Sequence, residues 1–207
     1  MVKERQRAVR REPDHAAVLE KAVEMLLAQG EKGFRIEQII EATGISKSSL
    51  YLHFGDRDGL IEAASLEIYS RQVIENIDRT VAVFNTVSTR DEVADLMANM
   101  LNTIFDQSED IRWNRVMVLA AARYRPALEL HLMEAQTKMN DDLGAALQRW
   151  YDLGILRPEI SPRDVAVMIQ AMTFGRLFRD LDMNKETSTR ESWLALQIVI
   201  HMSLLAD

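Results

Sequence analysis

Cysteine is absent from the sequence, which excludes disulfides and metal sites built on thiolates. Proline and glycine are also scarce, with four Pro and eight Gly in 207 residues. These two residue types interrupt helices and form the tight turns of β-rich folds. Since no segment keeps the alternating apolar pattern of a strand either, the sequence predicts an all-α protein.

Long apolar runs are missing as well. The longest is Val116–Ala122, far short of the roughly 20 residues that span a bilayer. The amino terminus is charged and has no apolar stretch behind it, so we expect no signal peptide. Together with the lack of cysteine, these features predict a cytoplasmic protein that has no membrane partner.

Signatures of catalysis and of metal binding are missing too. The four histidines, His15, His53, His131 and His201, fall in four different predicted helices, and no two have the spacing of metal ligands. The sequence has neither a glycine-rich phosphate loop nor a nucleophile elbow. We therefore expect no catalytic residues, no metal, no cofactor and no enzymatic activity.

The net charge of −7 is unevenly distributed. Residues 1–57 hold ten Lys or Arg against nine Asp or Glu, so the acidic excess belongs to the rest of the chain. Five of the first eleven residues are basic and one is acidic. Residues 1–13 are therefore predicted to form a basic arm, which is either a DNA-contacting arm or a solvated tail.

Residues 36–54 have the pattern of a helix-turn-helix. An amphipathic stretch, Ile36–Thr43, ends at Gly44, which can adopt the left-handed conformation that terminates helices. Ser46 is a good N-cap for a second short helix that runs to Phe54. Two short helices joined in this way present the second one to the major groove of DNA.

The second of these helices has a surface suited to DNA. Leu50 and Phe54 are four residues apart, so they share a face that should be anchored in the core. At about 100° per residue, the opposite face and its flanks then carry mostly small, polar or aromatic side chains: Lys47, Ser48, Ser49, Tyr51, Leu52 and His53. Such a surface allows a close approach to base edges, whereas an ordinary exposed helix would carry pairs of Glu and Lys.

These residues carry a resemblance to a known family. The segment GISKSSLYLHFGDRDGL, preceded by a helix that ends in AVEMLLAQG, closely resembles the DNA-binding domain of the TetR family of bacterial transcriptional repressors. The resemblance covers roughly residues 14–65. A weaker one, LGILRPEISPRDVAVMIQAMTFG at residues 153–175, is to the turn and penultimate helix of the same family. Two departures, Arg35 in place of a usual Ser or Thr cap and Ile40 in place of a usual Ala, lie away from the groove-facing surface.

The resemblance implies a role for each residue of the expected DNA surface. Lys47, Ser48, Tyr51 and Leu52 would face bases, and Ser49, Tyr51, His53 and Arg57 would hold phosphates. It also implies that the C-terminal domain binds a small effector that releases the protein from DNA.

The remaining sequence predicts about nine helices in two domains. We expect a three-helix DNA-binding domain at residues 14–60 and a helical domain for effector binding and dimerisation at residues 61–207. Asp56 is the expected cap of a fourth helix that continues from the first domain into the second. Thr89 and Glu92 have the spacing of a capping box, and Ser161-Pro162 is a favourable helix start.

The last two predicted helices are apolar on more than one face. Such helices must be covered on both sides, and a partner subunit can supply the second cover. We therefore expect a homodimer through these helices, in which two helices from each chain form a four-helix bundle. A single well-buried core is the alternative.

Methionine is concentrated in the second domain, since nine of the eleven Met residues fall at or after Met97. Met adapts to irregular shapes, so these residues suit either an apolar ligand or an ordinary core. The candidate effector-binding residues are Met97, Met100, Leu101, Trp113, Met117, Tyr124, His131, Met172 and Phe178. Arg123 and Gln170 are further candidates for orienting the polar end of a ligand.

The sequence is therefore identified as a member of the TetR family that acts as a homodimeric repressor. Its expected partners are a double-stranded operator with an inverted repeat and a small, mainly apolar effector that releases it. One alternative is a DNA-binding activator, or a regulator controlled by another protein, that has no small-molecule effector. The other is a helical enzyme or carrier that has kept a vestigial DNA-binding domain.

Overall fold

The computed structural model of the chain describes residues 14–105, 108–184 and 189–206. The chain divides into two compact units, Met1–Glu67 and Ile68–Asp207, and the division falls inside a helix. The only β pairing in the described residues is an isolated bridge between Leu156 and Leu205, so the predicted all-α fold is confirmed. The expected basic arm at residues 1–13 lies outside the described residues.

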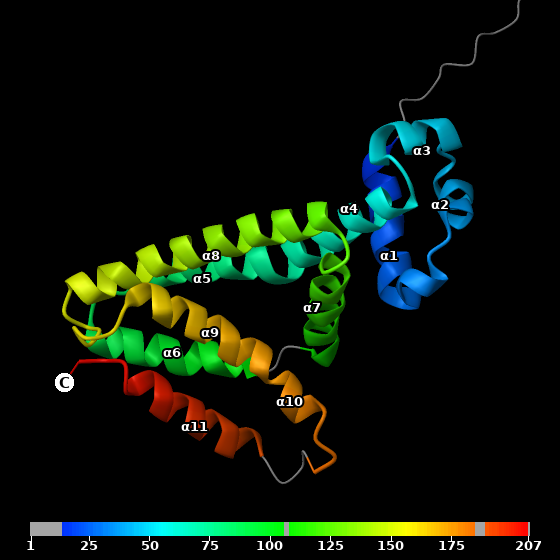
Figure 1. Ribbon diagram of the computed structural model, residues 1–207. Helices are drawn as coiled ribbons and strands as arrows, with labels where there is room; N and C mark the ends of the chain where they lie inside the picture. Colours follow the sequence, from blue (N-terminus) through cyan, green and yellow to red (C-terminus); the bar gives the residue numbers. More distant parts are fainter. Residues whose placement is uncertain (1–13, 106–107, 185–188, 207) are drawn as a thin grey trace, which may run out of the picture. The chain divides into compact units, whose positions relative to one another are not determined.

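The first unit contains α1 (His15–Gly33), α2 (Ile36–Thr43), α3 (Lys47–Phe54) and most of α4 (Arg57–Tyr69) (Figure 1). α1 breaks where its end was predicted, at Gly30, whose φ is 62°. The core between these helices is apolar and almost closed to solvent. Its buried side chains are Val18, Ala22, Val23, Met25, Leu26, Phe34, Ile36, Ile39, Ile45, Leu50, Leu60, Ile61 and Ala64.

Side-chain caps start the helices of this unit as the sequence predicts. The Ser46 Oγ accepts a hydrogen bond from the Ser49 N–H at 3.1 Å, and this fixes the start of α3. The Asp56 Oδ1 accepts from the Gly59 N–H at 2.8 Å at the start of α4. α2 has no side-chain cap at Arg35, so the departure from the family pattern leaves that helix start without one. Each Ser or Asp cap satisfies a backbone donor that the helix itself cannot pair.

Two glycines hold α3 between its neighbours. Gly44 ends α2 with φ 70°, a left-handed conformation that other residues rarely adopt. Gly59, in the first turn of α4, lies against the end of α3: a Cβ at this position would come within 2.0 Å of the Phe54 carbonyl oxygen. No larger side chain fits there unless the backbone moves, so Gly59 sets how closely α4 approaches α3.

The second unit continues the same helical stretch through η1 (Ser70–Ile74) and α5 (Glu75–Phe84). It then contains α6 (Arg90–Phe105), α7 (Glu109–Ala122), α8 (Pro126–Asp152), α9 (Pro162–Gly175), α10 (Leu177–Asp180) and α11 (Arg190–Met202). α4, η1 and α5 form one continuous stretch, and α10 follows α9 directly. With each of these counted as one helix, the described residues hold nine, as predicted.

Within this unit α8 is the central helix. α5 and α9 lie along it, and α11 packs on α6 (Figure 1). The core between them centres on Trp150, which is fully buried against Phe84 with 4.5 Å between ring centroids. The predicted capping box forms at the start of α6, where the Glu92 carboxylate accepts from the Ser88 and Thr89 N–H groups. These hydrogen bonds hold the pKa of Glu92 below its usual value.

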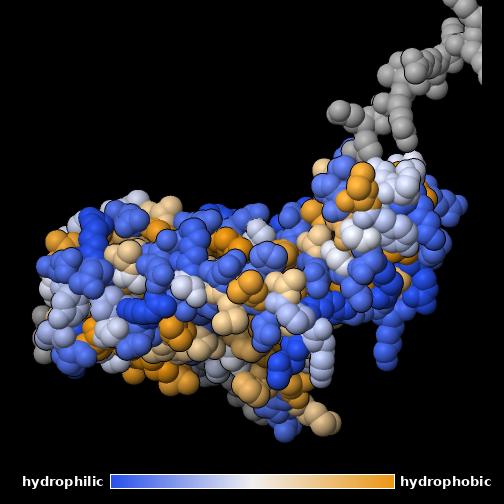
Figure 2. Space-filling model, turned by 45° about the horizontal axis from the view of Figure 1, so that its top comes forward, coloured by the Kyte–Doolittle hydropathy of each residue, from blue (hydrophilic) through white to orange (hydrophobic). Residues whose placement is uncertain are grey.

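Hydrophilic side chains cover most of the visible face of both units (Figure 2). Apolar side chains form smaller patches, most evident along the lower edge of the second unit in that view. Among the described residues no helix is both long enough and apolar enough to cross a membrane.

Candidate nucleic-acid interface and effector cavity

The outward surface of α3 is the candidate nucleic-acid interface. Leu50 anchors the helix in the core at 0% exposure, and Phe54 is half-buried. On the opposite face Leu52 is 90% exposed, although it is a large apolar residue. Leu52 lies one turn after Ser48 and Ser49 and contributes almost nothing to the core of this unit, so it is available to contact a partner.

Polar groups surround Leu52 on the same helix. Lys47 and Ser48 are exposed, and Ser49 and Tyr51 are half-buried. The Ser48 hydroxyl lies 3.1 Å from the Ser46 hydroxyl, and the Lys47 ammonium lies 5.7 Å from the centre of the Tyr51 ring. The helix therefore brings hydrogen-bonding groups, one positive charge and one apolar group together on a single surface.

Two of the expected phosphate ligands are held by contacts within the first unit. The His53 ring stacks on the His15 ring of α1, with 3.8 Å between centroids and an angle of 9° between the planes. The Arg57 guanidinium donates to the Glu31 carbonyl, lies over the Phe34 ring and is 3.5 Å from the Asp58 carboxylate. Arg57 is therefore committed in part to the fold of this unit, which the sequence did not reveal.

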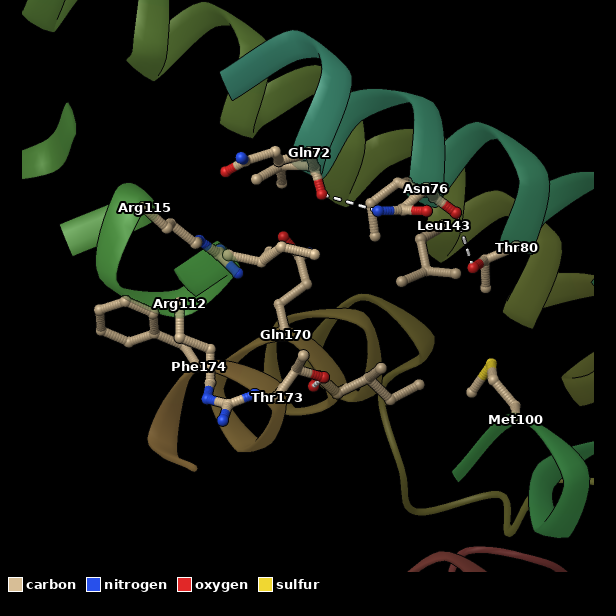
Figure 3. Close-up of a pocket in the computed structure, with 14 residues that line it drawn as sticks. Gln72, Asn76, Thr80, Met100, Arg112, Arg115, Leu143, Gln170, Thr173 and Phe174 are labelled. Atoms are coloured by element: carbon tan, nitrogen blue, oxygen red, sulfur yellow. Dashed lines mark hydrogen bonds between the residues drawn. The ribbon is translucent and has the colours of Figure 1, made fainter. Parts of the chain in front are cut away.

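A second candidate site is a cavity inside the second unit. It encloses about 720 Å³ of space between the atoms, the open solvent at its mouth included. Its walls come from η1, α5, α6, α7, α8 and α9 (Figure 3). The lining residues are Gln72, Val73, Asn76, Ile77, Thr80, Met100, Ile111, Arg112, Arg115, Leu143, Ile169, Gln170, Thr173 and Phe174.

A chain of hydrogen bonds runs through the protein at the polar end of this cavity. Arg115 is hydrogen-bonded to Tyr69, whose hydroxyl donates to the Gln136 Oε1 at 3.1 Å. The Gln136 Nε2 in turn donates to the Gln170 Oε1 at 2.8 Å. Burial raises the pKa of the Tyr69 phenol, and the nearby Arg115 charge opposes that rise only in part. Tyr69 therefore stays neutral at physiological pH.

The other arginine of the cavity is neutralised by the protein itself. Arg112 on α7 forms a two-pronged ion pair with Asp180 on α10, and its Nη2 donates to the Asp180 Oδ1 at 2.8 Å. Both side chains are more than nine-tenths buried. Ion pairs of this geometry fix the relative position of the two elements that they join.

The structure places the predicted effector-binding residues in three different environments. Met100 lines the cavity, as does Gln170. Leu101 and Met172 line a smaller adjacent space against α11, and Met97 is fully buried in the Trp150 core. Trp113, Met117 and His131 are exposed, as are Tyr124 at 86% and Phe178 at 80%, and none of these five lines the cavity. Arg123 is also exposed and does not line it.

The cavity therefore does not bring the predicted effector-binding residues together. The apolar, aromatic and methionine residues were grouped because they share helices, but several of them point outward from those helices. The residues that were missed are chiefly polar: Gln72, Asn76, Thr80, Arg112, Arg115 and Thr173. Gln72, Asn76 and Thr80 recur every four residues, so the sequence places them on one face of a helix. A polar face of this kind usually indicates exposure to solvent, which is why it did not point to a cavity.

Among the described residues, no group of three or more His, Asp or Glu side chains is placed to hold a metal ion.

Solved structures share the fold of the whole chain. A TetR-family transcriptional regulator from Rhodococcus sp. is 22% identical, with a TM-score of 0.62 over 92% of this chain and 97% of that one. One from Mesorhizobium loti is 16% identical, with a TM-score of 0.70 over 93% and 96%. A transcriptional regulator from Saccharomonospora viridis in complex with choline is 17% identical, with a TM-score of 0.63 over 93% and 97%.

A family model decides the identity of the first unit. Residues 18–64 match the model described as bacterial regulatory proteins, tetR family. The first unit is a DNA-binding domain of the tetR family. The match includes all of α2 and α3, so the resemblance that the sequence of these helices indicated is confirmed.

The first unit carries the DNA-binding domain, and transcription regulation through DNA is the function that the family model supports. No curated protein matches the chain closely enough to extend this further.

Proposed function

We propose that this regulator is a homodimeric repressor that acts in the cytoplasm, binds an inverted-repeat operator, and is released from it by a small, mainly apolar effector. The exposed surface of α3 is the observation that carries the proposal. Its one large apolar residue, Leu52, is 90% exposed and has hydrogen-bonding groups on either side. This combination is suited to the major groove, where bases present both polar edges and thymine methyl groups.

The proposed contacts divide into base readout and phosphate positioning. Lys47, Ser48, Tyr51 and Leu52 face bases, while Ser49, Tyr51, His53 and Arg57 hold phosphates. Base contacts specify the sequence, whereas phosphate contacts supply affinity that falls as salt rises. The internal contacts of His53 and Arg57 favour a preorganised arrangement, because little side-chain freedom remains to be lost on binding.

Selection of bound duplexes from a random pool tests the DNA half of the proposal. We expect an inverted repeat whose half-sites are about one helical turn apart or more. Arg57→Ala should weaken binding to all sequences alike and reduce the slope of affinity against salt by about one charge. Arg79→Ala, at an exposed arginine of the second unit, is the control and should change neither quantity. A change of preferred sequence in Arg57→Ala at an unchanged salt slope would contradict the assignment.

Apolar side chains on the last helices support the proposed dimer. Leu196 and Val199 on α11 are 52% and 66% exposed, and they lie three residues apart beside the exposed Ala195 and Ser203. Val167 and Ala171 form a similar exposed row on α9, followed by Phe178 on α10. Rows of small and apolar residues at this spacing permit two helices to pack closely. A two-fold axis would pair such rows from two copies.

Light scattering tests the dimer. Val199→Asp should produce a monomer that no longer binds the full operator tightly. Val83→Asp, at an exposed apolar residue of α5, is the matched control and should remain dimeric. A stable Val199→Asp monomer that bound the full site as tightly as the natural protein would refute the dimer.

The cavity supports control by a small molecule. Gln72 and Val73 in its wall belong to η1, the π-helical turn within the continuous helical stretch Arg57–Phe84. π-helical turns are frequent at functional sites, and their extra residue can be shifted along a helix. A ligand that moves η1 would act on the helix that begins next to α3 in the sequence.

Thermodynamic linkage gives the test of release. Ligand and operator must weaken each other by the same factor, typically equivalent to about 1–3 kcal/mol. We expect a cavity-binding ligand to raise the melting temperature of the free protein and to lower its affinity for the selected operator. Met100→Trp should fill part of the cavity and reduce both responses while operator binding without ligand persists. A bound ligand that left operator affinity unchanged would favour a regulator controlled by other means.

A further inference from the structure

The cavity of the second unit has an unbalanced positive charge at one end. We propose that its ligand is an amphipathic carboxylate, whose anionic head pairs with Arg115 and whose apolar body extends toward Leu143 and Met100. The inference rests on the proposed control by a small molecule and names the chemical class of that molecule.

The charge balance of the cavity is the first step. Of its two arginines, Arg112 is matched by Asp180 in a buried ion pair. Among the described residues Arg115 has no ion-pair partner, and the cavity lining contains no Asp or Glu. The group hydrogen-bonded to Arg115 is the Tyr69 phenol, which is neutral because its burial raises its pKa. One positive charge therefore remains at this end of the cavity.

The hydrogen-bonding capacity of Arg115 is the second step. Its Nε is buried and has no hydrogen-bond partner. A buried donor on a charged group is costly to leave unpaired, and a carboxylate is the acceptor that a guanidinium pairs with most strongly. The unpaired Nε leaves the Arg115 charge incompletely satisfied within the protein, which favours an anionic ligand near this residue over a purely apolar one.

Gln72 adds a second polar requirement at the same end. Its Oε1 is buried without a hydrogen-bond partner, and the residue lies above Arg115 in Figure 3. A carboxylate alone would not satisfy this acceptor, but a hydroxyl or amide N–H on the ligand would. A hydroxy acid or an N-acyl amino acid therefore fits better than a simple fatty acid.

The opposite end of the cavity is suited to the apolar body. Leu143 and Met100 lie there, well separated from Arg115 and Gln72 in Figure 3. Ile77 and Ile169 are further apolar residues of the lining. The polar groups of Asn76 and Thr80 are partly engaged by their own helix, since each donates to the carbonyl four residues earlier. A ligand lying along the cavity would thus have its charge at one end and its apolar part at the other.

A cationic ligand such as the choline bound by the Saccharomonospora viridis protein does not fit this arrangement. Cations are held by aromatic faces or by carboxylates. The single aromatic ring of the lining, Phe174, already has the Arg115 guanidinium 5.2 Å from its centre. A second cation there would be repelled by Arg115.

Isothermal titration calorimetry with matched probes tests the proposal. Each set holds the apolar body constant and changes the head group: 3-phenylpropionate, 3-phenylpropanol and (3-phenylpropyl)trimethylammonium, and the corresponding octyl series. At pH 7.5 and fixed ionic strength, at least one carboxylate should bind about tenfold more tightly than its alcohol, as expected for a charge-assisted hydrogen bond. The ammonium probe of that set should bind more weakly than the alcohol.

Substitutions at Arg115 test whether this residue is the source of the preference for a carboxylate. Arg115→Gln should remove the advantage of the carboxylate over the alcohol while the alcohol binds as before, and Arg115→Lys should keep part of it. Arg79→Gln, at an exposed arginine of α5 that pairs with Glu75, is the matched control and should keep all of it. If Arg115→Gln fails to fold, the comparison of head groups on the natural protein still decides the matter. A panel in which no carboxylate binds more tightly than its alcohol, the absence of any binding included, overturns the proposal.

The same probes separate this inference from the proposed function. Carboxylates that bind with the expected preference but leave operator affinity unchanged would refute release by ligand and retain the ligand class. Alcohols or ammonium probes that release the operator, while carboxylates bind no more tightly, would refute the ligand class and retain release.

Discussion

The recognition surface on α3 and the cavity of the second unit are built in opposite ways. The surface comes from the consecutive residues Lys47–Phe54, whose helix is fixed by the Ser46 cap and by Gly44 just before it. The cavity is lined from five separate helical segments, from the stretch of η1 and α5 at Gln72 to α9 at Phe174. A surface on one short helix follows from its local sequence. A cavity depends on where helices that are distant in sequence meet.

The two sites also differ in how their polar groups are satisfied. On α3 the exposed hydroxyl and ammonium groups are free to exchange partners with water. In two residues that line the cavity, the Arg115 Nε and the Gln72 Oε1 are buried without a hydrogen-bond partner. Substitutions in the second unit should therefore have larger energetic effects than substitutions on the α3 surface.

The largest effect is expected from breaking the buried ion pair beside the cavity. Arg112→Leu leaves the Asp180 carboxylate buried and unpaired, which should lower the free energy of unfolding of the second unit by about 3–5 kcal/mol. All three tryptophans, Trp113, Trp150 and Trp193, belong to this unit. Urea unfolding followed by tryptophan fluorescence therefore reports on it selectively.

The double variant is the control for this prediction. Arg112→Leu with Asp180→Leu removes both charges, and it should recover most of the lost stability because apolar residues often replace buried pairs at little cost. A double variant as unstable as Arg112→Leu would mean that the packing of these side chains, not their charge, holds α7 to α10.

A smaller effect is expected from filling the contact at Gly59. In Gly59→Ala the new Cβ would lie 2.0 Å from the Phe54 carbonyl oxygen, so α4 and the end of α3 must separate. Overpacking of this kind costs about 1–3 kcal/mol, which outweighs the gain of about 1 kcal/mol in helix propensity. We expect Gly59→Ala to lower both the stability of the first unit, measured by amide hydrogen exchange, and its operator affinity.

Gly175 on α9 provides the matched control. A Cβ there meets nothing within 4 Å, so Gly175→Ala should gain stability from helix propensity alone. If Gly59→Ala and Gly175→Ala changed stability by the same amount, the backbone at Gly59 and Phe54 would have moved apart at no cost in free energy.

These contrasts explain how much could be predicted. The caps at Ser46, Asp56, Thr89 and Ser161 were all readable, because each depends on a hydrogen bond to a residue three positions away. The role of Arg57 was only partly readable, since its contact with Glu31 joins residues that are 26 positions apart.

The cavity was the least predictable part. Met117 and Met100 look alike in sequence, but α7 presents Met117 to solvent whereas α6 presents Met100 to the cavity. The face that carries Gln72, Asn76 and Thr80 resembles a solvated one until α7 and α9 cover it. Helix periodicity shows which residues share a face, but it does not show what that face packs against.

Each unit has a helix that starts at a serine cap, so removal of the two caps allows a direct comparison of the units. Ser46 accepts from the Ser49 N–H at 3.1 Å, and Ser161 accepts from the Asp164 N–H at 3.3 Å. Loss of such a cap typically costs about 1 kcal/mol. Ser46→Ala should lower operator affinity as well as the stability of the first unit, whereas Ser161→Ala should lower only the stability of the second. If Ser161→Ala bound the operator more weakly under conditions in which the variant is fully folded, α9 and DNA binding would be coupled.

The smallest effect on stability is expected at the large apolar residue exposed on the outward face of α3. Leu52 is 90% exposed and contributes almost nothing to the core, so Leu52→Ala should change the unfolding free energy by less than about 0.5 kcal/mol. Its effect should instead appear in sequence preference. If Leu52 contacts a thymine methyl, its truncation should reduce discrimination at one or two positions of each half-site by about 1 kcal/mol and leave the salt dependence unchanged.

Binding to a panel of operators with single substitutions measures this discrimination. Leu130→Ala, at an exposed leucine of α8, is the control and should alter neither preference nor affinity. A Leu52→Ala protein that discriminated between bases as well as the natural one would assign base readout to Lys47, Ser48 and Tyr51 alone.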